Sequence, residues 1–171
     1  MSSTRNIIAV AKAISAVVVS DLGPPEEGAP AGTQQVISMA LVRDTRGYIS
    51  KIANQINGAY EHGWYDACAV MIRRLIETLI IECFEKHNIA GKIKNAKGDF
   101  LYLRDLIDIT VKETAFNLGR NTKTILPKIK EIGDKSAHSR YYVALRGDIQ
   151  PHISDVRTVI QELLFVSGLK K

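Results

Sequence analysis

Apolar residues recur at intervals of three and four over most of the chain from residue 34 onward, which is the spacing of amphipathic α-helices. One stripe consists of Ile49, Ile52, Ala53 and Ile56. The longest apolar stretch follows Asp66 and reads ACAVMIRRLIETLIIECFEKHNIAG. Because it is apolar around most of its circumference, we expect this helix at the centre of a bundle. No segment alternates strictly between apolar and polar residues, so the pattern predicts an all-α, up-and-down bundle of four to five core helices.

Polar and helix-breaking residues predict where these helices begin and end. Short polar side chains cap helix N-termini. We therefore expect helix starts at Asp44 or Thr45, at Asp99 and at Asp148. Pro127 and Pro151 are expected in the first turns of the last two helices, where the missing N–H of proline costs little. Gly63 and residues 88–91 predict the ends of two helices.

The first 33 residues differ from the rest of the chain. Ile7, Val10, Ile14 and Val18 follow helical spacing and predict a helix over residues 4–19. Residues 20–33, SDLGPPEEGAPAGT, contain three prolines and three glycines and are typical of a linker. We therefore divide the chain into an N-terminal helix on a flexible Pro/Gly-rich tether (1–33) and a helical-bundle domain (34–171). The apolar run 7–19 is shorter than a membrane span, so no membrane association is expected.

The composition limits the chemistry that the domain can carry. The 171 residues of the chain include 23 Lys and Arg against 18 Asp and Glu, and this net charge of +5 permits a polyanionic partner without requiring one. Cys68 and Cys83 fall in one predicted helix, about 22 Å apart along its axis, so they cannot pair with each other. Free thiols are typical of a reducing cytoplasm, and the four histidines show no metal-ligand spacing. We expect a cytoplasmic protein with no metal and no cofactor.

Ionisable residues interrupt the apolar surface of the central helix. Its core face is predicted to hold Ile72, Leu75, Ile76, Leu79 and Cys83. Asp66, Arg73 and Glu77 fall in one column on another side, with Arg74 next to it. The structural alternative for this column is an ion pair between Arg73 and Glu77, one turn apart. The polar side also carries apolar residues whose cover we expect from a second copy of the chain: Val70, Ile81 and Phe84.

A second column of polar residues falls near the end of a later predicted helix. Lys130, Asp134 and His138 follow one another at four-residue steps, so they share one helix face. Gly133 and Ser136 beside them are small, which lets a neighbouring backbone or a ligand approach closely. A histidine at a helix C-terminus also interacts favourably with the helix dipole, and this structural role is the alternative for His138.

Three segments resemble the helical domain of the HEPN superfamily (higher eukaryotes and prokaryotes nucleotide-binding). They are YEHGWYDACAVMIRRLIETLIIECFEKH, GDFLYLRDLID and KIKEIGDKSAHSRYY, and the resemblance covers residues 45–168. It implies a bundle of four to five helices that commonly dimerises and is often encoded among defence, restriction and toxin systems. Active members are metal-independent endoribonucleases, whose signature is an Arg, a polar residue and, a few positions later, a His.

The signature is only partly present. His138 matches the signature His and Asp134 matches the polar position, but the place of the Arg falls on Gly133. In the family chemistry the His moves a proton and the Arg stabilises charge on the phosphorane. Arg73 or Arg74 from the neighbouring helix is a hypothetical substitute. The missing Arg argues against catalysis.

Three functional hypotheses remain open at this point. The first is an RNA-binding or nucleotide-binding homodimer without nuclease activity, the second a non-catalytic interaction or dimerisation module, and the third a metal-independent endoribonuclease that uses His138. Candidate partners are RNA or a nucleotide, a second copy of the chain, and a larger defence or restriction assembly. The candidate catalytic residues are His138, Asp134, Arg73, Arg74 and Glu77, and the candidate nucleic-acid contacts are Lys130, Lys135, Arg140, Tyr141 and Arg146.

Overall fold

The computed structural model describes residues 7–10, 12–13 and 35–170, and in these parts of the chain all regular structure is helical. The α-helices are α2 (Met39–Val42), α3 (Gly47–Glu61), α4 (Tyr65–Lys86), α5 (Leu103–Thr110), α6 (Arg120–His138), α7 (Arg146–Ile149) and α8 (Ile153–Val166). Two 3₁₀ turns, η1 (Ala90–Ile93) and η2 (Gln150–His152), complete the set. Within the described ranges β-pairing is limited to one isolated bridge between Lys94 and Phe100, so the all-α prediction is confirmed.

The predicted N-terminal helix and its tether can be compared with the structure only in part. Residues 7–10 and 12–13 are helical, as expected. The remaining positions of the predicted helix, and the Pro/Gly-rich segment 20–33, lie outside the described residues.

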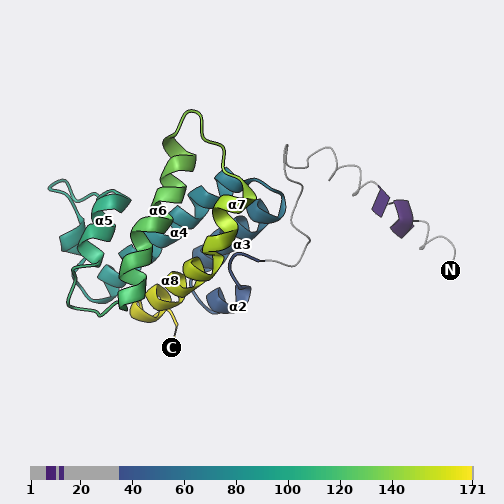
Figure 1. The fold of residues 1–171 in the computed structure, drawn as a ribbon. Helices are drawn as coiled ribbons and strands as arrows, with labels where there is room; N and C mark the ends of the chain where they lie inside the picture. Colours follow the sequence, from purple (N-terminus) through teal and green to yellow (C-terminus); the bar gives the residue numbers. More distant parts are fainter. Residues whose placement is uncertain (1–6, 11, 14–34, 171) are drawn as a thin grey trace.

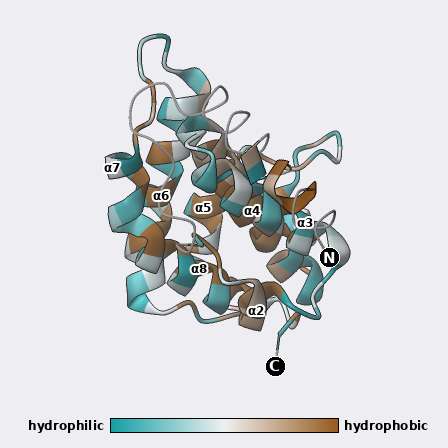
Figure 2. Ribbon diagram, turned by 90° about the vertical axis from the view of Figure 1, so that its right-hand side faces the viewer, coloured by the Kyte–Doolittle hydropathy of each residue, from teal (hydrophilic) through white to brown (hydrophobic). Residues whose placement is uncertain are grey.

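The four long helices α3, α4, α6 and α8 form the bundle, and α4 packs against each of the other three (Figure 1). The five residues predicted for the core face of α4, from Ile72 to Cys83, are all buried. Figure 2 shows apolar segments turned toward the middle of the bundle and hydrophilic segments toward the outside. Each large aliphatic side chain buried in this way contributes about 1.5–3 kcal/mol. None of the described helices combines the length and apolarity needed to cross a membrane.

The turn between α3 and α4 is closed by backbone hydrogen bonds. Gly63 has φ 73°, and the N–H of Trp64 donates to the carbonyl oxygen of Ala59 at 2.8 Å, as in a Schellman motif. Asn88 (φ 58°) ends α4 in the same way, through the bond from the Ile89 N–H to the Phe84 carbonyl. The predicted ends at Gly63 and at 88–91 are therefore confirmed.

The predicted helix starts are wrong at three places, because the polar residues belong to other turns. Thr45 donates its hydroxyl to the carbonyl of Val42 and so closes the end of α2, while Asp44 lies there at φ 62°. Asp99 donates its N–H to the Asn95 side chain, in the loop before α5. Asp148 lies inside α7 and accepts the Leu145 N–H, so it caps α7 and not α8.

The helix α6 also begins earlier than its sequence indicates. Glu162 of α8 accepts hydrogen bonds from the N–H of Gly119 and the hydroxyl of Thr122, and so caps the N-terminus of α6. Pro127 therefore lies inside the helix and not in its first turn. Its ring is on the exposed face, where water can hydrate the carbonyl that lacks a helical partner. Pro151 lies in η2, ahead of α8, and not within the first turn of that helix.

Cover for Phe84 comes from the same chain. Phe84 is buried, and Phe116 of the α5–α6 connection packs edge-on against it with ring centroids 5.3 Å apart. Val70 and Ile81 are half-buried. A second copy of the chain would therefore have less apolar surface of α4 to cover than the sequence indicated. The homodimer stays a prediction.

Candidate nucleic-acid interface

Gly133 lies at a close approach of α4 and α6. It is buried, and a Cβ atom at this position would lie 2.8 Å from Cβ of Arg73 and 3.1 Å from the carbonyl oxygen of Ala69. No side chain fits there without moving one of the two backbones. The position that the HEPN signature gives to Arg is therefore a helix-packing position in this chain.

The polar columns of α4 and α6 meet next to this glycine. Nε of Arg73 donates to Oδ1 of Asp134 at 2.9 Å, and Nζ of Lys130 donates to Oδ2 of the same carboxylate. Burial of Asp134 raises its pKa, but the hydrogen bonds and charges of Lys130 and Arg73 outweigh burial and hold the pKa below its ordinary value. The carboxylate is therefore ionised and satisfied by this chain.

The remaining polar residues of α4 lie at the margin of this cluster. Nη1 of Arg73 is 4.0 Å from a carboxylate oxygen of Glu77, the outer limit of an ion pair, so the ion pair considered as the structural alternative is loose. Arg74 is exposed. Asp66, at the start of α4, accepts the backbone N–H of Ala144 at 3.1 Å and so holds the α6–α7 loop against α4. The structure thus brings Arg73 and Asp134 together and leaves Arg74 apart.

His138 is the last residue of α6 and is exposed. Its imidazole makes no hydrogen bond or ion pair with the residues that the structure describes, whereas Asp134, one turn earlier, is fully engaged by Arg73 and Lys130. The predicted catalytic set therefore separates into an ionic cluster of Arg73 and Asp134, with Glu77 at its margin, and two exposed residues, Arg74 and His138.

The excess of positive charge is concentrated on α6 and the two residues that follow it. Residues 120–140 hold six basic and two acidic side chains, a net charge of +4, against +5 for the entire chain. The basic residues Arg120, Lys128, Lys135 and Arg140 are exposed, and the structure shows no acidic partner for them among the described residues. The exposed side of α6, which also carries the acidic Glu131, and the start of the loop after it thus contribute to the field that would attract a polyanion.

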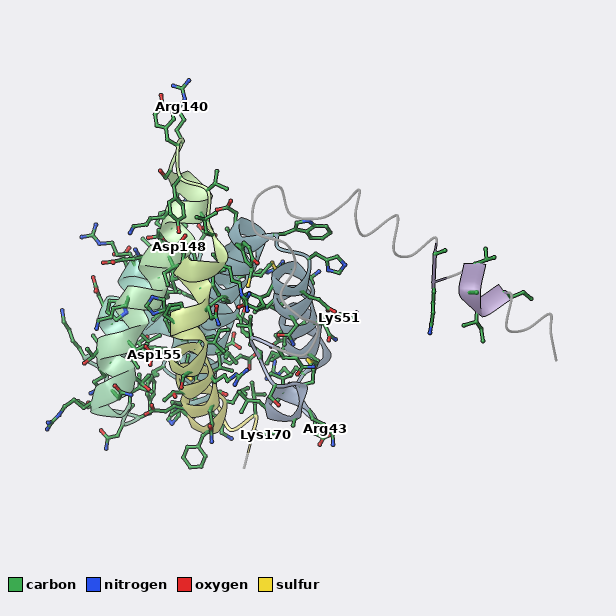
Figure 3. All side chains as sticks on the ribbon, turned by 45° about the vertical axis from the view of Figure 1, so that its right-hand side comes forward. Arg43, Lys51, Arg140, Asp148, Asp155 and Lys170 are labelled. Atoms are coloured by element: carbon green, nitrogen blue, oxygen red, sulfur yellow. The ribbon has the colours of Figure 1, made fainter. Side chains whose placement is uncertain are left out.

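The residues predicted to contact nucleic acid differ in their exposure and in whether they already have a partner within the chain. Lys135, Arg140 and Tyr141 are exposed, and the loop that carries the last two projects beyond the bundle, with Arg140 at its outer end (Figures 1 and 3). Lys130 is committed to Asp134. Arg146 is half-buried and has an interaction partner within the chain.

Tyr142 is less exposed than its neighbour Tyr141. It is half-buried, and burial together with the hydrogen bond and negative charge of Asp148 raises its pKa to about 12. Its hydroxyl therefore stays protonated and anchors the base of the loop to α7.

Sequence reasoning missed Trp64 and His62 in the α3–α4 turn. Trp64 is half-exposed, and its ring stacks on that of His62 with centroids 5.0 Å apart and 28° between the planes. The available signal was a lone tryptophan directly after a helix-ending glycine, where a bulky ring follows a turn and need not enter the core.

The described residues form neither a metal site nor a reactive thiol. Among the residues that the structure describes, no three His, Cys, Asp or Glu side chains gather as metal ligands would. Cys68 and Cys83 are both buried, and burial raises the pKa of each thiol to about 12, so neither forms a nucleophilic thiolate near neutral pH.

Known proteins offer no further guide to this interface. The resemblance to HEPN domains rests on the sequence motifs alone, and the structure adds an all-helical bundle, a fold class shared by many unrelated functions. Comparison with protein-family models, curated proteins and solved structures finds no match, so the chain is an all-helical domain for which no family is identified.

Proposed function

We propose that this domain binds RNA or a nucleotide polyphosphate through the exposed face of α6 and the loop that follows it, without cleaving the ligand. The observation that carries the proposal is the concentration of charge described above: residues 120–140 account for +4 of the net charge of +5. Exposed Lys and Arg side chains bind phosphates by releasing condensed counterions, so a basic helix face suffices for salt-dependent binding.

Catalysis is not part of the proposal. Gly133 stands where the nuclease signature needs a guanidinium, and the nearby guanidinium of Arg73 is already held by Asp134. A ribonuclease would also need a guanidinium fixed beside His138 to stabilise the phosphorane, whereas the basic residues nearest to it in sequence, Lys135 and Arg140, are exposed. The HEPN-like assignment and a place in a defence or restriction assembly rest on the sequence resemblance and remain proposals. The homodimer, which rests on the resemblance and on the apolar surface of α4, and the cytoplasmic location, which rests on the free thiols Cys68 and Cys83, remain proposals too.

Binding of a fluorescent RNA oligomer to the full chain at several salt concentrations tests the proposal. Replacing Lys128, Lys135 and Arg140 with Gln should weaken binding and reduce the slope of log K against log[salt] by about 2, since each phosphate contact to single-stranded nucleic acid contributes about 0.7. The matched control replaces three exposed basic residues on other elements with Gln, Lys51, Lys97 and Arg104, for the same change in net charge. This control variant should keep most of the affinity.

The outcomes of this experiment separate the hypotheses. Equal loss in both triple variants, or no binding at low salt, would overturn the proposed interface. A parallel arm with ATP in place of RNA distinguishes a nucleotide site from a nucleic-acid site. RNA cleavage in EDTA that disappears in His138→Ala would revive the ribonuclease hypothesis.

The interaction-module hypothesis has one observation in its favour. Tyr102 and Phe165 are large apolar side chains that are mostly exposed outside the basic face. Salt-insensitive self-association of the chain in sedimentation experiments, with no binding of RNA, would favour this hypothesis over ours.

A further inference from the structure

Two aromatic rings are exposed at the end of the bundle where the basic face of α6 finishes. Tyr141 is 86% exposed and Trp64 is 50% exposed. A hydrogen bond from the Ala144 N–H to Asp66 connects the two segments that carry these rings. Ala144 is three residues from Tyr141, and Asp66 is two residues from Trp64. Chain geometry therefore keeps the Cα atoms of Trp64 and Tyr141 within about 26 Å of each other.

Each ring is backed by a group that leaves stacking surface free. Trp64 lies over the imidazole of His62, and Nδ1 of that imidazole is 2.8 Å from the carbonyl oxygen of Gly58, which fixes the lower member of the stack. The guanidinium of Arg140 lies 5.4 Å from the ring centroid of Tyr141. The contact with His62 orients the Trp64 ring before any ligand arrives, which lowers the entropy cost of binding.

Trp64 is half-exposed although the turn that ends α3 fixes its backbone. Its N–H is tied to the Ala59 carbonyl in the Schellman turn, and Gly63 supplies the left-handed residue that the turn needs. The apolar residue at this point of such a turn usually packs back on the helix. Half of the Trp64 surface nevertheless stays open.

The charged and aromatic parts of this surface suit different parts of one ligand. Lys128, Lys135 and Arg140 follow one another along the exposed side of α6 and into the loop, where they can contact successive phosphates. Aromatic rings at the end of such a path bind bases by stacking, which requires bases that are not already paired and stacked in a duplex.

We infer that the ligand is single-stranded RNA and that its unpaired bases stack on Trp64 and Tyr141 while its phosphates lie along α6. This inference rests on the proposed function and adds to it the strandedness of the ligand and a second contact region. The ligand enters as a flexible strand and gains affinity from the rings without any sequence-specific hydrogen bond.

Fluorescence of the full chain tests the inference directly, because Trp64 is its only tryptophan. Titration with a uridine oligomer should quench the emission as a base stacks on the indole. Inorganic polyphosphate should compete for α6 without quenching, since it has no bases. A perfectly paired RNA duplex should leave the emission largely unchanged.

Substitutions provide an independent measurement with a matched control. Tyr141→Ala should weaken binding of the single strand about tenfold or more, whereas Tyr141→Phe keeps the ring and the affinity. The control is Tyr102→Ala, which removes a tyrosine of nearly equal exposure, 84%, from the start of α5 and should leave binding unchanged. Trp64→Phe should abolish the fluorescence signal but not the binding.

Failure of the inference differs from failure of the proposed function. The inference is overturned if single-stranded and duplex RNA bind equally, Trp64 emission does not change, and Tyr141→Ala is neutral, while the triple variant of α6 still binds weakly. The proposed function itself fails if neither RNA nor polyphosphate binds in a manner that depends on α6.

Discussion

The α4–α6 crossing and the outer end of α6 both contain ionisable residues, but these are paired within the chain at the crossing and exposed to solvent at the outer end. At the crossing, Asp134 receives hydrogen bonds from Arg73 and Lys130, and Gly133 lets the two helices touch. At the outer end, His138 and Arg140 are exposed and have no acidic partner among the described residues. Only three residues lie between Asp134 and His138, so chain position alone does not distinguish a charge paired within the protein from one that is free to bind a ligand.

This difference teaches which polar residues can hold a ligand. A charge that is partly buried must find a partner in its own protein, and a partner found in this way is not free to bind something else. A charge at the end of a projecting helix keeps its solvation and loses it only when a ligand replaces the water. The predicted catalytic residues fall mainly in the first group, whereas the predicted nucleic-acid contacts Lys135, Arg140 and Tyr141 fall in the second.

The largest expected effect concerns the packing at the crossing. Gly133→Ala should lower the free energy of unfolding by about 1–3 kcal/mol, although Ala is the better helix former, because its Cβ would lie 2.8 Å from Cβ of Arg73. Urea unfolding followed by circular dichroism measures the change.

A second helical glycine serves as the control for this substitution. Gly58, inside α3, has no atom within 4 Å of the place where a Cβ would stand. Gly58→Ala should therefore raise the free energy of unfolding by about 0.5–1 kcal/mol through helix propensity alone. If both substitutions stabilise the domain, α4 and α6 do not meet as closely as described.

The next largest effect on the free energy of unfolding is expected at the cluster of Arg73, Lys130 and Asp134. Asp134→Ala should cost about 1–2 kcal/mol, because it removes the acceptor of Arg73 and Lys130, and the three side chains are each less than a third exposed. Glu77→Ala should cost less than about 0.5 kcal/mol, because its contact with Arg73 is 4.0 Å long. A double-mutant cycle of Arg73 and Asp134 measures their coupling, and a coupling near zero would contradict the cluster.

The same carboxylate predicts how stability depends on pH. The pKa of Asp134 in the folded domain lies below its ordinary value of 3.8. Its contribution is therefore fully present above pH 3.8 and is lost as the pH falls through the lower, folded-state pKa. The difference in unfolding free energy between the natural chain and Asp134→Asn should be constant near neutral pH and shrink below pH 3.8.

The sequence predicted the buried apolar faces of the helices better than the residues at which the helices begin. The buried face of α4, for example Leu75 and Leu79, follows from helical periodicity, which is a local property of the chain. The start of α6 does not, because its cap is Glu162, 43 residues away from Gly119. Local signals therefore fixed the existence and the core face of a helix, while tertiary partners determined where it begins.

The candidate site also combines features that follow from local periodicity with features that depend on tertiary structure. Two columns of ionisable residues were visible in the sequence, and their meeting through Arg73 and Asp134 required only that two helices be neighbours. The exposure of His138 was not visible, since it depends on a loop that leaves the bundle after α6. The stacking of Trp64 on His62 was equally hidden, because it depends on the backbone of a turn and not on a periodic pattern.

The smallest expected effect on stability is at the outer end. His138→Ala should change the free energy of unfolding by less than about 0.5 kcal/mol, because the imidazole is exposed and bonds to none of the described residues. Urea unfolding at neutral pH checks this, and a larger loss would mean that the imidazole secures the end of α6 through the helix dipole. If the bundle is unaffected, any loss of RNA binding in His138→Ala reports contact with the ligand. The same loss in Gly133→Ala or Asp134→Ala would report damage to the fold, so only the exposed end allows binding and stability to be separated by a single substitution.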